Sequence, residues 1–141
     1  MSEIIVAYWS GTGNTAAMAD YVGQGIEESG KKARVVSISE ITPDSLKDAS
    51  VFALGCPSMG AEQLEEGEME PFVEAVKAFA AGKTIGLFGS YGWGDGEWMR
   101  SWKERADASG ASVYDDGLMI CGAPEAADAR CTELGEGMAN W

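Results

Sequence analysis

The stretch Glu-Ile-Ile-Val-Ala-Tyr-Trp-Ser-Gly-Thr-Gly-Asn-Thr, residues 3–15, decides the fold class. Residues 3–9 are a run of β-branched and aromatic side chains that stops at a glycine-containing loop, which predicts a strand buried on both faces. Residues 15–29 have apolar side chains at helical spacing, and Gly30 is a typical helix stop. A strand, a tight loop and an amphipathic helix form the first unit of an α/β protein.

The rest of the chain continues this alternation. Apolar runs predict four more strands at residues 33–38, 51–56, 84–89 and 112–121, the last one broken near Asp115 and Asp116. Helical spacing predicts helices near residues 72–80 and 98–108 and a last helix that opens at Pro124, with a turn or short helix at 44–48. Parallel strands need crossover connections, so we expect a mostly parallel sheet with helices on both faces, in one domain that spans residues 1–141.

The charge of the chain excludes several kinds of function. There are 23 acidic residues against 10 basic ones, which gives a net charge of −13, and there is no histidine. Such a field repels nucleic acids and anionic membranes and favours encounter with basic protein surfaces. The absence of histidine removes the commonest general base and the commonest metal ligand.

The three cysteines, Cys56, Cys121 and Cys131, are too few and too widely spaced for a disulfide framework. Cys56 and Cys121 each end an apolar run, where a buried thiol is expected. We find no signal-peptide pattern near the N-terminus and no apolar run of the roughly 20 residues that a membrane span needs. These features predict a cytoplasmic protein.

The first unusual loop follows the first strand directly and reads Ser10-Gly11-Thr12-Gly13-Asn14-Thr15. Its two glycines allow close approach to a ligand, and amides at the start of a helix attract an anion. The loop lacks the Gly-Lys-Ser/Thr of a Walker A motif, and Ala16 replaces the last glycine of the dinucleotide pattern. Because no Arg or Lys precedes Lys31, neutral dipoles would hold the phosphate, which suits a mononucleotide. A capped turn without a ligand is the alternative.

Two more loops follow the third and fourth strands. The second loop reads Pro57-Ser58-Met59-Gly60-Ala61-Glu62, and the third reads Gly89-Ser90-Tyr91-Gly92-Trp93-Gly94-Asp95-Gly96. Met59 and Trp93 follow no core periodicity, so each is either a stray surface side chain or the cover of a flat ring. Carboxyl ends of parallel strands share one edge of a sheet, where ligands bind. Together the loops predict a site for a planar heterocycle with a phosphorylated tail.

Three motifs in this order resemble the short-chain flavodoxins of anaerobic bacteria. They are Tyr-Trp-Ser-Gly-Thr-Gly-Asn-Thr at 8–15, Gly-Cys-Pro-Ser-Met-Gly at 55–60, and Phe-Gly-Ser-Tyr-Gly-Trp-Gly-Asp-Gly at 88–96. The resemblance runs over essentially the whole chain. It implies a flavodoxin-like three-layer sandwich, with a five-stranded parallel sheet of order 2-1-3-4-5 and FMN at the switch point.

The same resemblance implies how FMN is held without a covalent bond. It assigns the phosphate to the side chains of Ser10, Thr12, Asn14 and Thr15 and the amides of Gly11 and Gly13. Trp93 resembles the outer ring cover, Met59 the inner cover, Glu62 the acceptor for the ring N3–H, and the Gly60–Ala61 peptide the link that reorients on reduction. Pro57 and Ser58 complete the second loop, and residues 89–92, which are Gly89, Ser90, Tyr91 and Gly92, line the pyrimidine side. Gly94 is also expected to contact the cofactor.

The implied function is that of a low-potential one-electron carrier that uses the semiquinone/hydroquinone couple and shuttles electrons between redox enzymes in place of ferredoxin. It implies a monomer without catalytic residues. The acidic residues 62–70 either dock basic surfaces of partner proteins or form a solvated loop. Ala61 and Ala123 depart from more polar residues of relatives, so the potentials are expected to shift. A small NAD(P)H-dependent FMN quinone reductase and a cofactor-free interaction module are the alternatives. A phosphoacceptor domain is excluded because its aspartates are missing at Trp9-Ser10 and Cys56-Pro57.

Overall fold

A computed structural model describes residues 3–11, 13–60 and 62–140 of the chain. Its strands are β1 (Glu3–Tyr8), β2 (Lys32–Ser37), β3 (Val51–Gly55), β4 (Thr84–Tyr91), β5 (Ser112–Val113) and β6 (Leu118–Cys121). Its α-helices are α1 (Asn14–Glu28), α2 (Met69–Lys77), α3 (Glu97–Ala108) and α4 (Ala129–Ala139). Short 3₁₀ turns are η1 (Ile38–Glu40), η2 (Pro43–Leu46) and η3 (Tyr114–Asp116).

The strands form one parallel sheet in the order β2-β1-β3-β4-β5, and β6 also pairs with β4. β5 pairs with the start of β4, at Thr84 and Ile85, and β6 pairs with its end, from Phe88 to Tyr91. β5 and β6 are therefore two halves of one edge strand, interrupted by η3. The expected strand order and the break near residues 115–116 are both confirmed.

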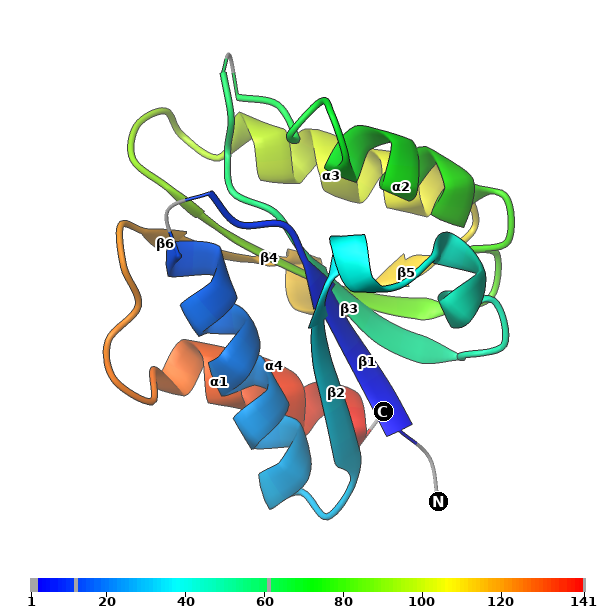
Figure 1. Ribbon diagram of the computed structural model, residues 1–141, viewed down its shortest axis with the longest axis vertical. Coiled ribbons are helices and arrows are strands. Elements are labelled where there is room, and N and C mark those ends of the chain that lie inside the picture. Colours follow the sequence, from blue (N-terminus) through cyan, green and yellow to red (C-terminus); the bar gives the residue numbers. More distant parts are fainter. Residues whose placement is uncertain (1–2, 12, 61, 141) are drawn as a thin grey trace.

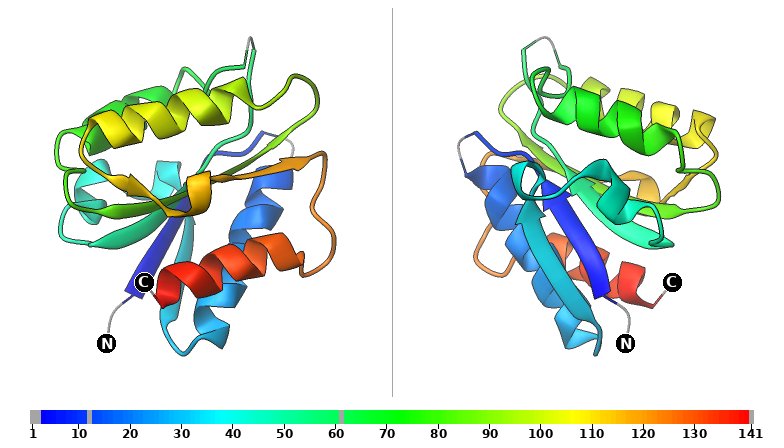
Figure 2. Two further views of the ribbon diagram at one scale, coloured as in Figure 1. Left: turned by 180° about the vertical axis from the view of Figure 1, so that it is seen from behind. Right: turned by 45° about the vertical axis from the view of Figure 1, so that its right-hand side comes forward.

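Helices cover both faces of the sheet. Figures 1 and 2 show α1 and α4 on one face and α2 and α3 on the other. The alternation of side chains along β1 feeds two separate cores, because Ile5 and Ala7 face α2 and α3 while Ile4 and Val6 face α1 and α4. The three-layer arrangement is the one that the sequence predicts.

Glycines let α1 and α4 touch backbone to backbone. A Cβ atom at Gly25 of α1 would overlap the carbonyl oxygen of Thr132, and one at Gly135 of α4 would overlap the carbonyl oxygen of Val22. Any larger side chain at either position would push the two helices apart. This pair of helices thus fixes α1, whose first residues belong to the site described below.

Two predicted boundaries are wrong. β4 does not end at residue 89 but continues to Tyr91, because β6 supplies a hydrogen-bonding partner along that stretch. The last helix does not open at Pro124 but at Ala129, since Ala127 has a left-handed φ of 49° and the Asp128 side chain caps the helix by accepting from Arg130 N.

The prediction for Cys121 is also wrong. Its thiol is exposed, whereas Cys56 is buried as expected, and Cys131 is buried as well. Cys121 lies on β6, where the alternation of the strand directs Ile120 into the core between α1 and α4. The residues on either side of Ile120 consequently face outward.

Candidate functional site

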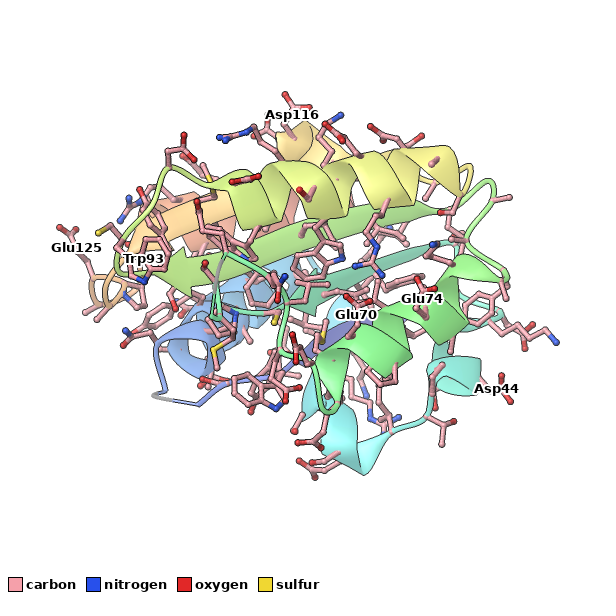
Figure 3. All side chains as sticks on the ribbon, turned by 90° about the horizontal axis from the view of Figure 1, so that it is seen from above. Asp44, Glu70, Glu74, Trp93, Asp116 and Glu125 are labelled. Carbon is pink, nitrogen blue, oxygen red and sulfur yellow. The ribbon has the colours of Figure 1, made fainter. Side chains whose placement is uncertain are left out.

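Three chain segments meet at the carboxyl edge of the sheet, which is the end of β4 beside Trp93 in Figure 3. They enclose a hollow of about 280 Å³. We call it the flavin hollow after the ligand that the sequence resemblance implies, and its lining residues are Gly11, Asn14, Pro57, Ser58, Met59, Ser90, Tyr91, Gly92 and Gly122. The structure thus brings the three predicted loops together, while Thr12 and Ala61 lie outside the described residues.

Gly122 belongs to this hollow, although the sequence reasoning did not assign it to the site. Its N–H donates to the carbonyl of Tyr91 at 2.8 Å, and its φ is 75°. The available signal was its position directly after the last apolar run, at a fourth strand end on the same edge.

The first segment presents the start of α1. Gly13 takes a left-handed φ of 100° as the N-cap, and the hydroxyl of Ser10 accepts from the amides of Gly13 at 3.1 Å and Ala16 at 3.3 Å. Among the described residues, no hydrogen bond is formed by the amides of Asn14 and Thr15, and the first turn holds no acidic residue. The positive end of the helix dipole therefore faces outward without a negative partner.

The other three α-helices differ from α1 at their N-termini, because a carboxylate of the chain caps each of them. Glu65 accepts from the amides of Gly67, Glu68 and Met69 at 2.7–2.9 Å, just before and at the start of α2. Burial opposes its ionisation, but these three backbone donors hold the pKa of Glu65 below its ordinary value. α2 is thus closed to an external anion.

Glu62 and Asp128 close the remaining two helices. Glu62 Oε1 accepts from the amides of Gly96 and Glu97 at the start of α3, at 3.2 Å and 3.1 Å. Hydrogen bonds from the side chain and backbone of Arg130, with one from the backbone of Glu125, lower the pKa of Asp128 at the start of α4. Among the four α-helices, only α1 keeps its N-terminus available for an anion from outside.

A buried hydroxyl pair joins the first segment to β4. Thr15 Oγ1 lies 3.1 Å from Ser90 Oγ and accepts from Ser90 N at 3.4 Å, and both residues are buried. The Thr15 hydroxyl, which the resemblance assigns to the phosphate, lies within hydrogen-bond distance of β4 in the structure. Thr15 therefore fixes the position of the loop relative to the sheet.

The second segment is a tight hairpin. Met59 and Gln63 exchange two backbone hydrogen bonds of 2.8 Å, so the chain turns tightly between them. Gly60 and Glu62 both have left-handed φ values, 52° and 53°. That conformation is uncommon for a residue with a side chain. The two bonds from Glu62 to the start of α3 compensate for it.

The third segment displays an exposed indole. Trp93 is 65% exposed although it is a large apolar residue, and Met59 on the facing hairpin is 37% exposed. Below them, the ring centroid of Tyr91 is 5.6 Å from that of Trp98, and Trp98 Nε1 donates to the carbonyl of Cys56 at 3.1 Å. The base of the site is therefore held rigidly, while Trp93 and Met59 remain available to cover a flat ring.

The described residues give little support for a reactive thiol or a metal site. Burial raises the pKa of the Cys56 thiol to about 12, so it is not a nucleophile at neutral pH. No cluster of three or more potential metal ligands occurs in the part of the chain that is described. Within the same part, no helix has the length and apolar character needed to cross a membrane.

The strand order, the neutral loop at the start of α1 and the two exposed apolar side chains at one sheet edge define a mononucleotide-binding α/β protein. Comparison with known proteins makes the class specific. The family model described as Flavodoxin matches residues 6–134. The chain is 44% identical over 135 residues to a flavodoxin of Clostridium beijerinckii, covering 96% of this chain and 98% of the relative.

A flavodoxin of Megasphaera elsdenii is 43% identical over 142 residues, covering 99% of this chain and 98% of the relative. The solution structure of the two-electron reduced Megasphaera elsdenii flavodoxin superposes with a TM-score of 0.89 at 40% identity, covering 98% of this chain and 99% of that one. The chain therefore belongs to the flavodoxin family, whose members bind FMN and transport electrons.

Proposed function

We propose that this protein is a low-potential one-electron carrier, formed by residues 1–141 as a single FMN-binding unit, that shuttles electrons between redox enzymes in place of ferredoxin. The observation that supports the proposal is the flavin hollow, which is lined by Asn14 at the start of α1 and by Met59, with the exposed Trp93 next to its lining residue Gly92. When bound, FMN supplies a redox centre that accepts two electrons in separate steps. The chain's own residues determine how easily each electron enters.

The first segment is proposed to hold the phosphate. The amides of Asn14 and Thr15 have no partner among the described residues, and Ser10 has already oriented those of Gly13 and Ala16. Gly11 allows close approach, and the side chains of Ser10 and Asn14 would add hydrogen bonds, with Thr12 beside them. No basic side chain lines this hollow, so neutral dipoles would balance the charge of the phosphate.

The two exposed apolar side chains are proposed to sandwich the ring. Trp93 would stack on its outer face and Met59 would cover its inner face, which excludes water from both sides. Pro57, Ser58 and Gly89–Gly94 would surround the edges. Glu62 is proposed to accept from the ring N3–H through Oε2, because Oε1 is already bonded to the start of α3.

The charge of the chain is proposed to set the low potential. The second electron adds negative charge to a ring in apolar surroundings and within a protein of net charge −13. Both the loss of hydration and the repulsion between like charges oppose it. The fully reduced protein would therefore be a strong reductant. By the family resemblance, Ala61 and Ala123 replace more polar or acidic residues of relatives, which would moderate this effect.

The turn at Gly60 is proposed to respond to the first electron. Its φ of 52° is available to glycine at little cost. In the Gly60–Ala61 peptide, the carbonyl of Gly60 would turn to accept a hydrogen bond from a ring N–H. Proline at position 60 requires a φ near −65° and prevents this turn. Gly60→Pro should therefore shift the first-electron potential, and an unchanged potential would contradict the role of the peptide.

We propose that the protein is a monomer that docks the basic surfaces of its partner proteins through acidic residues 62–70. We assign no residue a catalytic role. Its three free thiols suit a reducing cytoplasm. No binding of nucleic acid or membrane is proposed, because the chain carries a net charge of −13.

The test is a visible absorption spectrum of the FMN-loaded protein during stepwise anaerobic reduction. Two separate one-electron steps, with the second at the lower potential, are expected. A single two-electron step together with turnover of NADH would replace this proposal with a quinone reductase. A protein that takes up no FMN would contradict the proposal altogether.

A further inference from the structure

The loop at the start of α1 has a second hollow beside it, in addition to the flavin hollow. This hollow has a volume of about 510 Å³, and we call it the rear hollow. It is lined by Ser10, Gly11 and Gly13 of the loop, by Ser39 after β2 and by Glu68 before α2. Gly11 lines both hollows. Because the loop is not packed against other elements over these two surfaces, its position depends on individual contacts.

One hydrogen bond crosses the rear hollow. Trp9 Nε1 donates to Glu68 Oε1 at 3.2 Å, and the two residues are 59 positions apart in the chain. Among the described residues, no other side-chain hydrogen bond joins residues 8–13 to the segment before α2. The indole of Trp9 is partly buried and packs against the core beneath α2 and α3. The hydrogen bond therefore fixes the polar edge of a ring whose other side is already packed.

The indole supports the backbone of the loop. A Cβ atom at Gly11 would lie 3.2 Å from Cη2 and 3.4 Å from Cζ3 of Trp9, so the ring lies directly against Gly11. Gly11 is two residues before Gly13, the N-cap of α1. The position of the indole consequently determines where the backbone of the loop lies relative to the start of α1.

The backbone of Glu68 is itself held firmly. Its N–H donates to Glu65 Oε1 at 2.7 Å, and the same oxygen accepts from the N–H of Met69 at 2.9 Å. Met69 is fully buried at the start of α2. A continuous series of contacts thus runs from the start of α2, through Glu68 and Trp9, to Gly11.

We infer that Glu68 is a positioning residue for the phosphate of FMN and that it acts through Trp9. Its carboxylate holds the indole, and the indole supports Gly11, so that the amides at the start of α1 keep the arrangement that the phosphate needs. This role rests on the proposed function, which places the phosphate at the start of α1. It is opposite in sign to the effect of the charge alone, because a carboxylate near a phosphate repels it.

The experiment measures the dissociation constants of FMN and of riboflavin, which lacks the phosphate, with the full chain. Glu68→Ala is expected to raise the constant for FMN about fivefold and that for riboflavin less than about twofold, because the loss is confined to the phosphate. Glu68→Gln keeps an acceptor oxygen without the charge and should retain most of the affinity for FMN.

The matched control is Glu40→Ala. Glu40 follows the lining residue Ser39 and forms no ion pair among the described residues, so this variant removes a nearby charge without removing the contact. It should not weaken the binding of FMN. An equal loss in Glu40→Ala and Glu68→Ala, or tighter binding of FMN by Glu68→Ala, would overturn the positioning role.

A double-mutant cycle tests the link to Trp9. Trp9→Phe removes the indole N–H, so adding Glu68→Ala to it should weaken the binding of FMN by less than about twofold more. Losses that multiply in the double variant would contradict the link, and the Glu68 variants alone decide the role if Trp9→Phe does not fold. A wild type that prefers FMN to riboflavin, with the same preference in Glu68→Ala, would overturn the positioning role alone. A wild type without this preference would overturn the proposed phosphate site as well.

Discussion

The starts of the four α-helices differ in one respect. The starts of α2, α3 and α4 are each bound by a carboxylate of the chain, from Glu65, Glu62 and Asp128. Within the described part of the chain, the start of α1 is bound only by the neutral hydroxyl of Ser10. All four lie at the same edge of the sheet, where each helix dipole is positive.

Under the proposed function, this difference explains how a protein with a charge of −13 would bind a dianionic phosphate. It places carboxylates on the helix starts that must stay closed and keeps them away from the one that must stay available. No lysine or arginine lines the flavin hollow, so in this proposal the position of the phosphate is set by where negative charge is absent. The two predictions with the largest expected effects alter each side of this comparison.

Ser10→Asp should have the largest effect, because it gives α1 the same kind of cap as the other helices. The new carboxylate would accept from Gly13 and Ala16 and repel the phosphate, and it should raise the dissociation constant for FMN about 100-fold, or roughly 2.7 kcal/mol. Quenching of FMN fluorescence measures it. Ser10→Asn introduces a neutral side chain with the shape of aspartate, and it should raise the dissociation constant for FMN less than about tenfold. An equal loss in both variants would show that charge is not the cause.

Asp128→Ala alters the other side of the comparison and should reduce stability by about 1–2 kcal/mol, because it removes the cap of α4. Urea unfolding at pH 7 measures this loss, and the affinity for FMN should not change. Asp107→Ala, which breaks an exposed ion pair with Lys103, is the control and should cost less than about 1 kcal/mol.

The pH dependence of the Asp128 effect has a definite sign. The folded-state pKa of Asp128 is lower than that of the unfolded chain, which is about 3.9. Its contribution is therefore fully present above that pH and is lost as the pH falls further. The difference between wild type and Asp128→Ala should shrink between pH 5 and pH 3, apart from any part due to packing. A constant difference would contradict the electrostatic account.

Ser90→Ala should have the smallest effect, because it removes one of the two contacts that join the first segment to β4. A loss of about 1 kcal/mol in stability is expected. The affinity for FMN should fall by a few-fold, since the amides of α1 would be less firmly held. Urea unfolding and FMN titration of the same sample measure the stability and the affinity. A loss of stability without any loss of affinity would show that this contact does not hold the amides of α1 in place for FMN.

Much of this arrangement could be predicted from the sequence, because it depends on local patterns. The alternation of buried strands and amphipathic helices gave the α/β class, and the motifs at 8–15, 55–60 and 88–96 predicted which loops meet. The error at Pro124 arose because a proline at a helix start is common, whereas the cap of α4 depends on Asp128 and on the left-handed Ala127.

Long-range contacts could not be predicted in this way. Cys121 ends an apolar run, but its exposure depends on β6 being an edge strand with one partner. The bond between Thr15 and Ser90 joins residues 75 positions apart, and Glu62 reaches amides 34 and 35 positions away. Spacing along the chain holds no information on such pairs, so the closed helix starts became visible only in three dimensions.

The most direct test of the central claim compares FMN with riboflavin, which lacks the phosphate, in the wild type and in Ser10→Asp. The account predicts that the wild type binds FMN at least about 100-fold more tightly than riboflavin, and that Ser10→Asp nearly removes this preference by weakening FMN alone. Equal affinities of the wild type for FMN and riboflavin would contradict the claim that the start of α1 holds the phosphate.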